Sequence, residues 1–360
     1  MVENQFLDNL DQLETNSQIF IYGAGIFGRN FLEMVRAFRS DISVSGFIDR
    51  KKSGLVSGVP VLSLDDFNLE KPSYDHIIIS TSPNLWNEIT ETFEKNRIQK
   101  CVINRHFDFD IFGEKKLNKN KLVQDNYETI KQLLKKKNDK DIWYTIYNSI
   151  MKNNIKKCLS YYNKNDLSEK NFYEDFRPKA GDFVINGGAF GGGETESYAR
   201  AVGKEGKIFA FDPRANVENL IKECLLENVE TIPRALWKNS QKMFFENTGS
   251  TTTISEKDKV DTNEIETISV DDFVLEEKIK HLDFIKLDVE GAEMEVLKGA
   301  ERAIRAFNPA LAISIYHKLE HFVEIPKYIK YLTSEGYEYH IRYYDPCCID
   351  TYFFAIPIAH

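Results

Sequence analysis

The 360-residue sequence predicts an α/β protein in which a helical connector joins two Rossmann-like domains. Two observations support this fold class. Twice along the chain, a short apolar run typical of a buried parallel strand leads into a glycine-rich loop and then into a helical pattern. The long segment between these two units is rich in Lys and Asn and shows no strand pattern. We expect the domains at residues 1–110 and 178–360, with the connector at 111–177.

The composition is that of an ordinary globular protein. With 42% hydrophobic and 29% charged residues, the chain can bury two cores and still present a polar surface. No apolar run approaches the roughly 20 residues of a membrane span, and the acidic N-terminus lacks the apolar stretch of a signal peptide. The net charge of -9 argues against a nucleic-acid partner. We therefore expect a cytoplasmic protein with no membrane span and no nucleic-acid partner.

The first glycine motif stands in the context that nucleotide binding requires. A strand-like run, Gln18–Tyr22, leads into the spacing Gly23, Gly25, Gly28, and the next predicted strand ends at Asp49. Such glycines let the backbone approach a pyrophosphate at a helix N-terminus, and an acid at this distance can bind ribose hydroxyls. The alternative is a Rossmann-like domain whose glycines serve only packing.

Further predicted strands at 58–62, 76–80 and 101–103 complete this unit. It closes near residue 110, which leaves no room for the substrate domain of a dehydrogenase. The segments YGAGIFG, GFID and GVPV resemble the small N-terminal nucleotide-binding domain found on enzymes that modify nucleotide-linked sugars. The resemblance covers roughly residues 17–105 and implies a nucleoside diphosphate sugar as ligand, with NAD as the alternative.

The connector carries apolar and aromatic residues at helical spacing, among them Ile142, Trp143 and Ile146. A stripe of this kind is usually part of a core. We expect the connector to pack on one of the domains or on a second copy of the chain, which makes a homo-oligomer possible.

The second glycine loop differs from the first. A predicted strand at 182–185 is followed by the loop Asn186–Gly193, and the next strand ends in Asp212. The loop brings backbone close to a ligand, because five of its residues are glycines. Its spacing is not GxGxxG, so a compact ligand with a ribose diol at Asp212 fits better than a pyrophosphate.

A third segment places two acids where a strand becomes a loop. The apolar run Phe284–Leu287 has the character of a buried parallel strand, and a helical pattern begins after Gly291. Asp288 and Glu290 lie between them. Ligands of open α/β sheets bind at the carboxyl ends of the strands, so these acids are candidates for a site. The alternative is that they cap the helix that follows.

Four ordered segments carry a family resemblance: VINGGAFGGGETE, IFAFDP, TISVDDF and DFIKLDVEGAEMEVLKGA. They resemble the FkbM family of S-adenosylmethionine-dependent methyltransferases, over about residues 178–358. The resemblance implies a class I methyltransferase sheet, with a fifth strand at 310–317 and a terminal antiparallel hairpin at 337–344 and 351–357. It also implies S-adenosylmethionine as cofactor.

The resemblance assigns cofactor-binding roles to individual residues. Gly188, Ala189 and Gly192 would shape the loop around the methionine part of the cofactor. Asp212 would bind the ribose, and Ala235 would lie near the adenine.

One cofactor-binding position departs from the family. The loop usually opens with an aspartate, and this chain has Asn186 there. An amide still forms hydrogen bonds, but it lacks the charge that would attract the ammonium group of the cofactor. We therefore expect Asn186 to contact the cofactor, and we expect the protein to bind the cofactor with reduced affinity.

Four residues are candidates for the chemistry. By the resemblance, Asp288 and Glu290 would lie beside the sulfonium and the acceptor. His317, at the end of the predicted fifth strand, is our candidate for the general base, because imidazole titrates near neutral pH. Lys286 should share a face of its strand with Asp288 and pair with it. Whether Asp288 and Glu290 also bind a divalent cation stays open, since oxygen ligands suit Mg²⁺.

The leading hypothesis is an O-methyltransferase that acts on a carbohydrate or nucleotide-linked sugar, in the biosynthesis of a surface polysaccharide. One alternative is an NAD-dependent oxidoreductase that uses the first glycine loop. A second is a non-catalytic module that only senses ligands.

Overall fold

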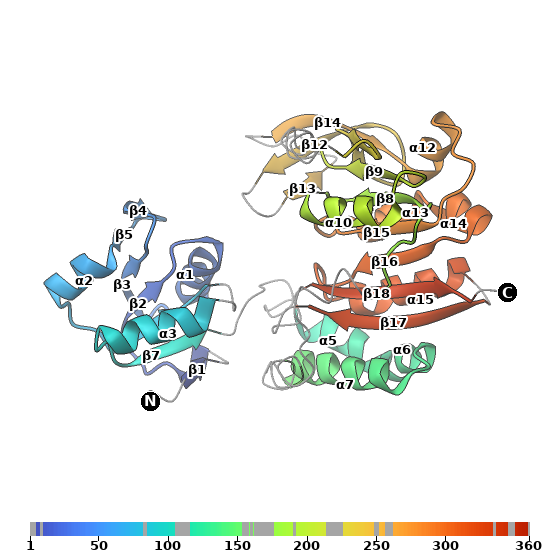
Figure 1. Cartoon of the computed structure of the whole chain (residues 1–360). Coiled ribbons are helices and arrows are strands. Elements are labelled where there is room, and N and C mark those ends of the chain that lie inside the picture. Colours follow the sequence, from blue (N-terminus) through green and yellow to red (C-terminus); the bar gives the residue numbers. More distant parts are fainter. Residues whose placement is uncertain are drawn as a thin grey trace. The chain divides into compact units, whose positions relative to one another are not determined.

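The structure is a computed structural model of the chain (Figure 1). It describes residues 5–7, 10–81, 85–104, 116–152, 158, 161, 176–189, 192–213, 226–247, 252–255, 262–333, 336–344 and 350–358. Two compact units can be distinguished. The first comprises Met1–Glu114 and Asn148–Leu159, and the second comprises Lys115–Tyr147 and Ser160–His360.

The first unit contains a seven-stranded sheet in the order β1-β7-β6-β2-β3-β5-β4. Its strands are β1 (Gln5–Leu7), β2 (Gln18–Tyr22), β3 (Ser43–Ile48), β4 (Gly54–Val56), β5 (Val59–Leu62), β6 (His76–Ile79) and β7 (Cys101–Asn104). All neighbouring pairs are parallel except β4 and β5. From β5 to β7 the order corresponds to 3-2-1-4-5, five of the six strand positions of the Rossmann fold.

Helices α1 (Ile26–Phe38), α2 (Leu64–Glu70) and α3 (Trp86–Lys95) accompany this sheet, and a short 3-10 helix (Leu10–Gln12) precedes β2. Helix α1 packs through Phe31, Leu32 and Val35 against buried residues of the central strands, such as Ile21 and Phe47. Strands covered on both faces need apolar residues in succession, which explains the uninterrupted apolar runs in the sequence.

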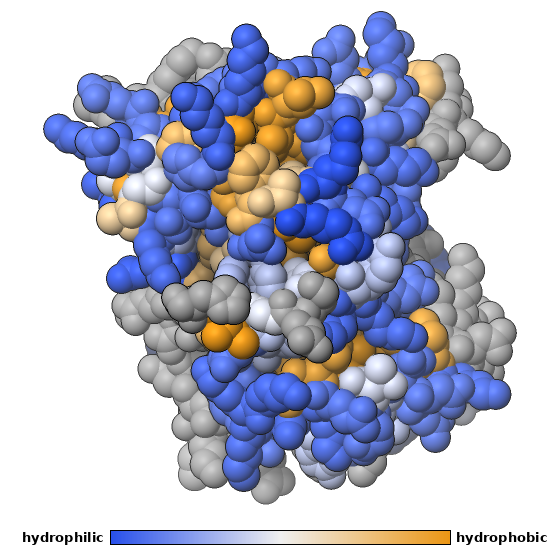
Figure 2. Space-filling model, turned by 90° about the vertical axis from the view of Figure 1, so that its right-hand side faces the viewer, coloured by the Kyte–Doolittle hydropathy of each residue, from blue (hydrophilic) through white to orange (hydrophobic). Residues whose placement is uncertain are grey.

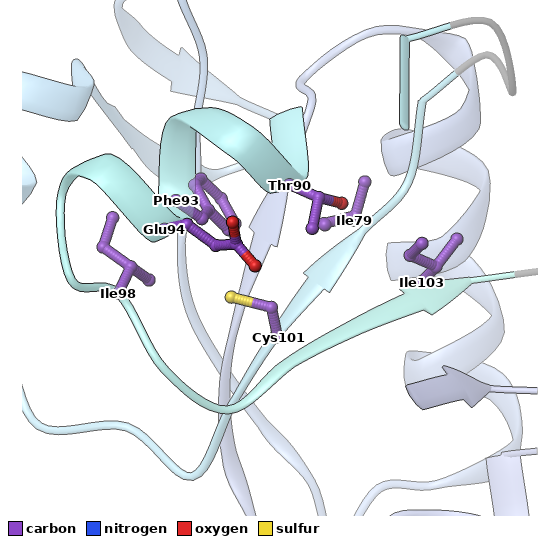
Figure 3. A pocket seen from close by; sticks show the side chains of 7 residues that line it. All are labelled: Ile79, Thr90, Phe93, Glu94, Ile98, Cys101 and Ile103. Atoms are coloured by element: carbon purple, nitrogen blue, oxygen red, sulfur yellow. The ribbon is translucent and has the colours of Figure 1, made fainter. Parts of the chain in front are cut away.

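A small cavity lies under α3 in the first unit (Figure 3). Its volume is about 10 Å³, enough for roughly one water molecule. Its walls are formed by Ile79, Thr90, Phe93, Glu94, Ile98, Cys101 and Ile103. Burial raises the pKa of the Cys101 thiol to about 12. A void of this size with an unreactive thiol is a packing defect, not a ligand site.

The second unit is built on a mixed seven-stranded sheet in the order β10-β9-β8-β15-β16-β18-β17. Its strands are β8 (Phe183–Gly187), β9 (Lys207–Phe211), β10 (Val229–Ile232), β15 (Phe284–Leu287), β16 (Ala310–Ser314), β17 (Tyr337–Tyr343) and β18 (Thr351–Pro357). Only β18 runs antiparallel to its neighbours. The expected terminal hairpin is present, and the predicted α/β fold class is confirmed.

Helices cover this sheet and form its core with it. They are α10 (Gly193–Val202), α12 (Val270–Glu276), α13 (Glu293–Lys298), α14 (Glu301–Phe307) and α15 (His321–Thr333). Tyr198 and Val202 of α10 pack on Val184, Ile208 and Phe284 of three adjacent strands. This packing fixes the strand ends that carry the candidate residues.

A smaller sheet stands between β10 and β15 in the chain, with the strand order β11-β14-β12-β13. Its strands are β11 (Ala235–Leu236), β12 (Lys242–Asn247), β13 (Thr252–Ser255) and β14 (Thr262–Ile268). The predicted elements did not include these strands, because β11 is only two residues long and β12, β13 and β14 lack a sustained apolar alternation.

The residues expected to form a connector contain α5 (Lys116–Asp125), α6 (Tyr127–Leu133) and α7 (Lys137–Lys152). Helices α5 and α6 contact α15, so this part of the chain belongs to the second unit (Figure 1). On α7, Asp139 is buried and lies 2.9 Å from Nδ1 of His340 on β17. Arg342 donates to the same carboxylate.

The surface is largely polar. Figure 2 shows one face on which hydrophilic residues predominate and hydrophobic residues gather in limited areas. Across the ranges that the structure describes, no helix has both the length and the apolar character needed to cross a membrane.

Candidate active site

The candidate site lies where β8, β15 and β16 end, because these three strands are adjacent and parallel. The loop after β8 touches the backbone after β15. A Cβ atom added to Gly188 would lie 1.8 Å from the carbonyl oxygen of Asp288, and Gly188 has a φ of +81°. Only glycine fits this position. The second glycine loop and Asp288, singled out separately in the sequence, therefore meet.

The glycine loop is held against β9. The backbone N–H groups of Gly188 and Ala189 both donate to the carbonyl oxygen of Phe211, at 2.9 and 3.1 Å. Gly192, with a φ of +76°, then begins the turn into α10. The bonds to Phe211 thus fix the start of the loop.

Asn186 has one buried oxygen without a partner. The residue is fully buried, and its Nδ2 donates to Oγ1 of Thr195 at 3.0 Å. Its Oδ1 has no hydrogen-bond donor. Burying a carbonyl oxygen without a hydrogen-bond donor lowers the stability of the fold. This atom is therefore suited to accept a hydrogen bond from a ligand in the loop.

Asp212 and Ala235 are both buried in the second unit. Asp212 directly follows β9, at the end of the strand beside β8. Ala235 begins β11 of the smaller sheet. Asp212 stands at the strand end that the sequence indicated, and Ala235 follows β10 by three residues.

Asp288 is surrounded by donors. The hydroxyl of Tyr352 donates to its Oδ2 at 2.6 Å, and that of Tyr316 donates to its Oδ1 at 3.3 Å. The ammonium of Lys286 lies 3.9 Å from Oδ2. Such an environment stabilises the charged carboxylate. Lys286 and Asp288 therefore share a pocket, as their spacing on the strand predicted.

Lys286 is buried and pairs with a further acid. Its Nζ lies 2.5 Å from Oε2 of Glu194 in the first turn of α10. Burial alone would lower the pKa of Lys286, but Glu194 and Asp288 outweigh it and raise the pKa. Lys286 is therefore a charged ammonium and has no lone pair with which to act as a base.

His317 lies among three carboxylates. Its Nε2 is 3.5 Å from Oδ1 of Asp288 and 3.4 Å from Oε2 of Glu290. Its Nδ1 is 2.9 Å from Oε1 of Glu293. Burial lowers the pKa of His317, but the carboxylates of Glu293, Glu290 and Asp288 raise it well above 6.5. Without a ligand the imidazole is positively charged at neutral pH.

Glu293 organises the loop after β15. Its side chain is fully buried, and Oε1 accepts N–H bonds from Val289 at 2.9 Å and Gly291 at 3.2 Å. The hydroxyl of Ser314 adds a bond of 3.1 Å to the same oxygen. Between the two backbone donors, Glu290 has a φ of +54°, a region that non-glycine residues rarely adopt.

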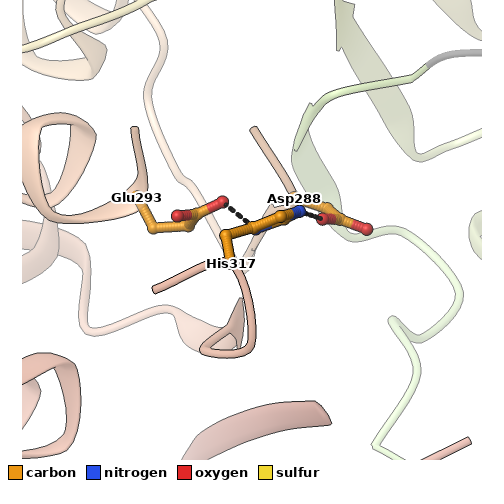
Figure 4. Close-up of side chains that lie close together, drawn as sticks. All are labelled: Asp288, Glu293 and His317. Atoms are coloured by element: carbon orange, nitrogen blue, oxygen red, sulfur yellow. Dashed lines mark ion pairs between the residues drawn. The ribbon is translucent and has the colours of Figure 1, made fainter. Parts of the chain in front are cut away.

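The arrangement does not favour a divalent cation. Within the described part of the chain, Asp288, Glu293 and His317 form a group whose potential ligand atoms lie within 4.8 Å of one another (Figure 4). Oε1 of Glu293, however, already accepts the backbone, hydroxyl and imidazole donors. A metal would have to displace these bonds. Glu290, which the sequence left open as a candidate ligand beside Asp288, is not part of this group.

In the first unit, the predicted glycines and acid also come together. The N–H of Ala24 donates to Oδ2 of Asp49 at 2.7 Å. A Cβ on Gly28 would lie 1.8 Å from the carbonyl oxygen of Gly23, so glycine is required for this turn. At Gly25 a Cβ would meet no atom within 4 Å. Close packing therefore explains why glycine is needed at position 28, but it gives no reason for the glycine at position 25.

Asp49 is engaged with the backbone. Its Oδ1 accepts N–H bonds from Lys51 at 2.8 Å and Lys52 at 3.0 Å. Burial raises the pKa of Asp49, but these bonds and that from Ala24 outweigh it and lower the pKa. The carboxylate is charged, and the bond that it accepts from Ala24 helps to hold the glycine loop in place.

Several residues of the second-unit cluster were not predicted as site residues: Glu194, Glu293, Ser314, Tyr316, His321 and Tyr352. Tyr316 and Ser314 stand beside His317 in the sequence, and that proximity was a usable signal. Glu293 gave the pattern of a helix start. Tyr352 lies 64 residues beyond Asp288, so only the sheet order could have revealed it.

Comparison with known proteins shows that part of the chain matches a known protein family. Residues 186–339 match the family model described as the methyltransferase FkbM domain. None of the curated protein sequences compared with the chain matches it significantly.

Among solved structures, the chain resembles the methyltransferase FkbM from Methylobacillus flagellatus. The two share 17% sequence identity, and the match covers 96% of this chain and 92% of that chain with a TM-score of 0.68. A SAM-dependent methyltransferase from Aquifex aeolicus matches with 17% identity over 55% of this chain and 96% of that chain, with a TM-score of 0.31. A SAM-dependent O-methyltransferase from Thermotoga maritima matches with 15% identity over 54% of this chain and 66% of that chain, with a TM-score of 0.32.

Proposed function

Residues 186–339 form a methyltransferase FkbM domain, and on this premise we propose that the protein is an S-adenosylmethionine-dependent O-methyltransferase. Its acceptor is the hydroxyl of a carbohydrate or nucleotide-linked sugar, in the biosynthesis of a surface polysaccharide. The observation that carries the proposal is the contact between the glycine loop after β8 and the Asp288–His317 cluster after β15 and β16. A ligand on that loop lies beside the cluster.

The residues of the loop fit the cofactor. The unpartnered Oδ1 of Asn186 can accept a hydrogen bond from its ammonium group, and Gly188, Ala189 and Gly192 would shape the loop around its methionine part. Asp212, at the end of β9, takes the ribose, and Ala235 lies near the adenine. When bound, the cofactor supplies a methyl group on a positively charged sulfur.

The chain must position the acceptor hydroxyl and remove its proton. Alignment of the two reacting atoms supplies much of the acceleration. We place the hydroxyl at Nε2 of His317, where Asp288 and Glu290 also converge. As the acceptor oxygen gains the methyl group, its proton passes to Nε2, which is why the imidazole must first be neutral.

Cofactor binding favours that neutral form. A positively charged sulfur bound beside Asp288 would repel the imidazolium and compete with it for the carboxylate. Both effects would lower the pKa of His317 from its raised value. Asp288 would face the sulfonium, held in place by its contacts with Tyr352, Tyr316 and Lys286.

Incubation of the full chain with methyl-labelled S-adenosylmethionine and a panel of free and nucleotide-linked sugars tests the proposal. We expect label in at least one sugar, and its loss in the His317→Ala variant. A protein that binds S-adenosylmethionine but labels no sugar would contradict the acceptor class. Added EDTA should leave the rate unchanged, since a metal would have to displace the backbone, hydroxyl and imidazole donors that Oε1 of Glu293 already accepts.

The first unit is proposed to bind a nucleoside diphosphate sugar at Gly23–Gly28. A side chain at Gly25 meets no atom of the protein, so Gly25→Val should fold normally and obstruct the ligand. Calorimetry should show binding of a nucleotide sugar by the parent chain and little binding by the variant. Preferential binding of NAD would instead favour the oxidoreductase alternative.

A further inference from the structure

We propose that Glu293 is a positioning residue, whose buried carboxylate fixes the orientation of both His317 and the loop that carries Glu290. This inference rests on the proposed function of the site. It assigns to Glu293 two effects: Nδ1 of His317 carries a proton, and Nε2 is directed to the acceptor. Glu293 itself touches neither cofactor nor acceptor.

The two nitrogens of His317 have different partners. Nδ1 lies 2.9 Å from Oε1 of Glu293, the shortest of its contacts with carboxylates. Nε2 faces the more exposed Asp288 and Glu290 at 3.5 and 3.4 Å. A carboxylate at one imidazole nitrogen keeps the proton there and leaves the other nitrogen available for proton transfer. Glu293 therefore determines which nitrogen meets the acceptor.

The same oxygen of Glu293 holds the loop. Its bonds to the N–H groups of Val289 and Gly291 enclose Glu290, whose φ of +54° is unfavourable for a residue with a side chain. This conformation brings Oε2 of Glu290 to 3.4 Å from Nε2 of His317. One carboxylate thus places both groups that flank the proposed hydroxyl position.

A simpler role for Glu293 is a helix cap, since it is the first residue of α13. A neutral glutamine accepts the two backbone bonds equally well. A cap also does not need complete burial or contact with two imidazoles. Oε2 of Glu293 lies 3.3 Å from Nδ1 of His321, which is buried as well. The positioning role therefore requires the negative charge of Glu293, whereas a helix cap requires only a hydrogen-bond acceptor of the right shape.

The test compares Glu293→Gln with the parent chain. Glutamine keeps the size of the side chain and the backbone bonds but removes the charge at Nδ1 of His317. We expect kcat to fall by about 100-fold, as for loss of an orienting carboxylate or proton transfer. The KM for either substrate should change by less than about threefold, because no substrate contact is lost. Glu293→Asp should recover part of kcat.

Glu295→Gln is the matched control on the same helix. Glu295 pairs with Lys298 and Lys238 away from the cluster, so its loss of charge should leave kcat unchanged. Thermal unfolding of each variant shows whether the fold is intact. Equal kcat values for the parent and Glu293→Gln would overturn the proposal.

A second readout does not depend on turnover. Imidazole ¹⁵N NMR of the full chain, assigned with a His317→Asn variant, reports which nitrogen carries the proton when the ring is neutral. We expect Nδ1–H for His317 at alkaline pH, whereas a free histidine prefers Nε2–H. An Nε2–H signal in the parent chain would overturn the proposal even if Glu293→Gln failed to fold. An Nδ1–H signal without sugar methylation would support Glu293 while contradicting the proposed function.

Discussion

At the scale of single residues, Asn186 combines complete burial with an oxygen that lacks a donor. We predict that Asn186→Asp binds S-adenosylmethionine about tenfold more tightly, because a charged acceptor forms a stronger hydrogen bond with an ammonium group. Thr195 can donate its hydroxyl to the new carboxylate. Calorimetry measures the affinity, and Asn239→Asp supplies the same charge at an exposed position. Unchanged or weaker binding by Asn186→Asp would show that this oxygen does not face the cofactor.

His317 makes stability depend on pH. Because its pKa in the folded protein is raised above the usual 6.5, its ion pairs contribute fully to stability below that value. The contribution is lost as pH rises through the higher folded pKa. We predict that the parent chain exceeds His317→Asn in free energy of unfolding most at mildly acidic pH, and that the difference shrinks at alkaline pH. Urea unfolding at several pH values measures this, and a constant difference would contradict a charged imidazole.

The raised pKa of His317 also affects catalysis, with the opposite dependence on pH. If His317 accepts the proton of the acceptor, the rate must rise as the imidazole loses its charge. We therefore predict that kcat/KM increases with pH across the neutral range and above.

Glu293 contributes to stability with the opposite dependence on pH, because its contribution is lost as pH falls. Burial raises its pKa, but His317 and His321 outweigh this and lower it well below 4.5, so its contribution is lost only in strong acid.

At the scale of elements, the contact between the β8 loop and the end of β15 decides whether the site forms. We predict that Gly188→Ala destabilises the second unit by about 2 kcal/mol or more, because the methyl group would overlap the carbonyl of Asp288 and φ is positive. Gly193→Ala, five residues on, places its methyl group in open space. Chemical unfolding should separate the two variants. Equal stability would contradict the close approach of loop and strand.

The helices before the second sheet are fixed by a buried charge. Asp139 of α7 accepts from His340 and Arg342 of β17. Asp139→Ala removes the buried carboxylate that faces the Arg342 guanidinium, and we predict a loss of about 3 kcal/mol or more in the free energy of unfolding. Asp141→Ala removes a surface pair with Lys137 on the same helix and should cost about 0.5 kcal/mol or less. Similar unfolding midpoints for the two variants would contradict a structural role for Asp139.

At the scale of the whole molecule, the sequence predicted the features that depend on local order. Apolar runs, glycine loops and acids at strand ends indicated both parallel sheets, because each signal lies within a few residues of the next. The class I methyltransferase sheet with its terminal hairpin was predicted from the family resemblance. The smaller sheet from β11 to β14 was not predicted, because its strands carry no sustained apolar alternation.

The site was predicted in part, for the same physical reason. Asp288, Lys286 and His317 were recognised because they stand at strand ends. Glu194 and Tyr352 reach the cluster from α10 and β18, and Tyr352 is 64 residues from Asp288 in sequence. Three-dimensional packing alone brings such residues together. Glu293 was inside a recognised motif, but its burial could not be distinguished from capping without the structure.

The central claim is that the second unit transfers a methyl group to a sugar oxygen. The most direct measurement is ¹³C NMR of the product formed by the full chain from ¹³C-methyl S-adenosylmethionine and an accepted sugar. We predict one labelled methyl group bonded to oxygen, at a single position of the sugar. A labelled methyl group on nitrogen or carbon, or on no sugar at all, would contradict the account.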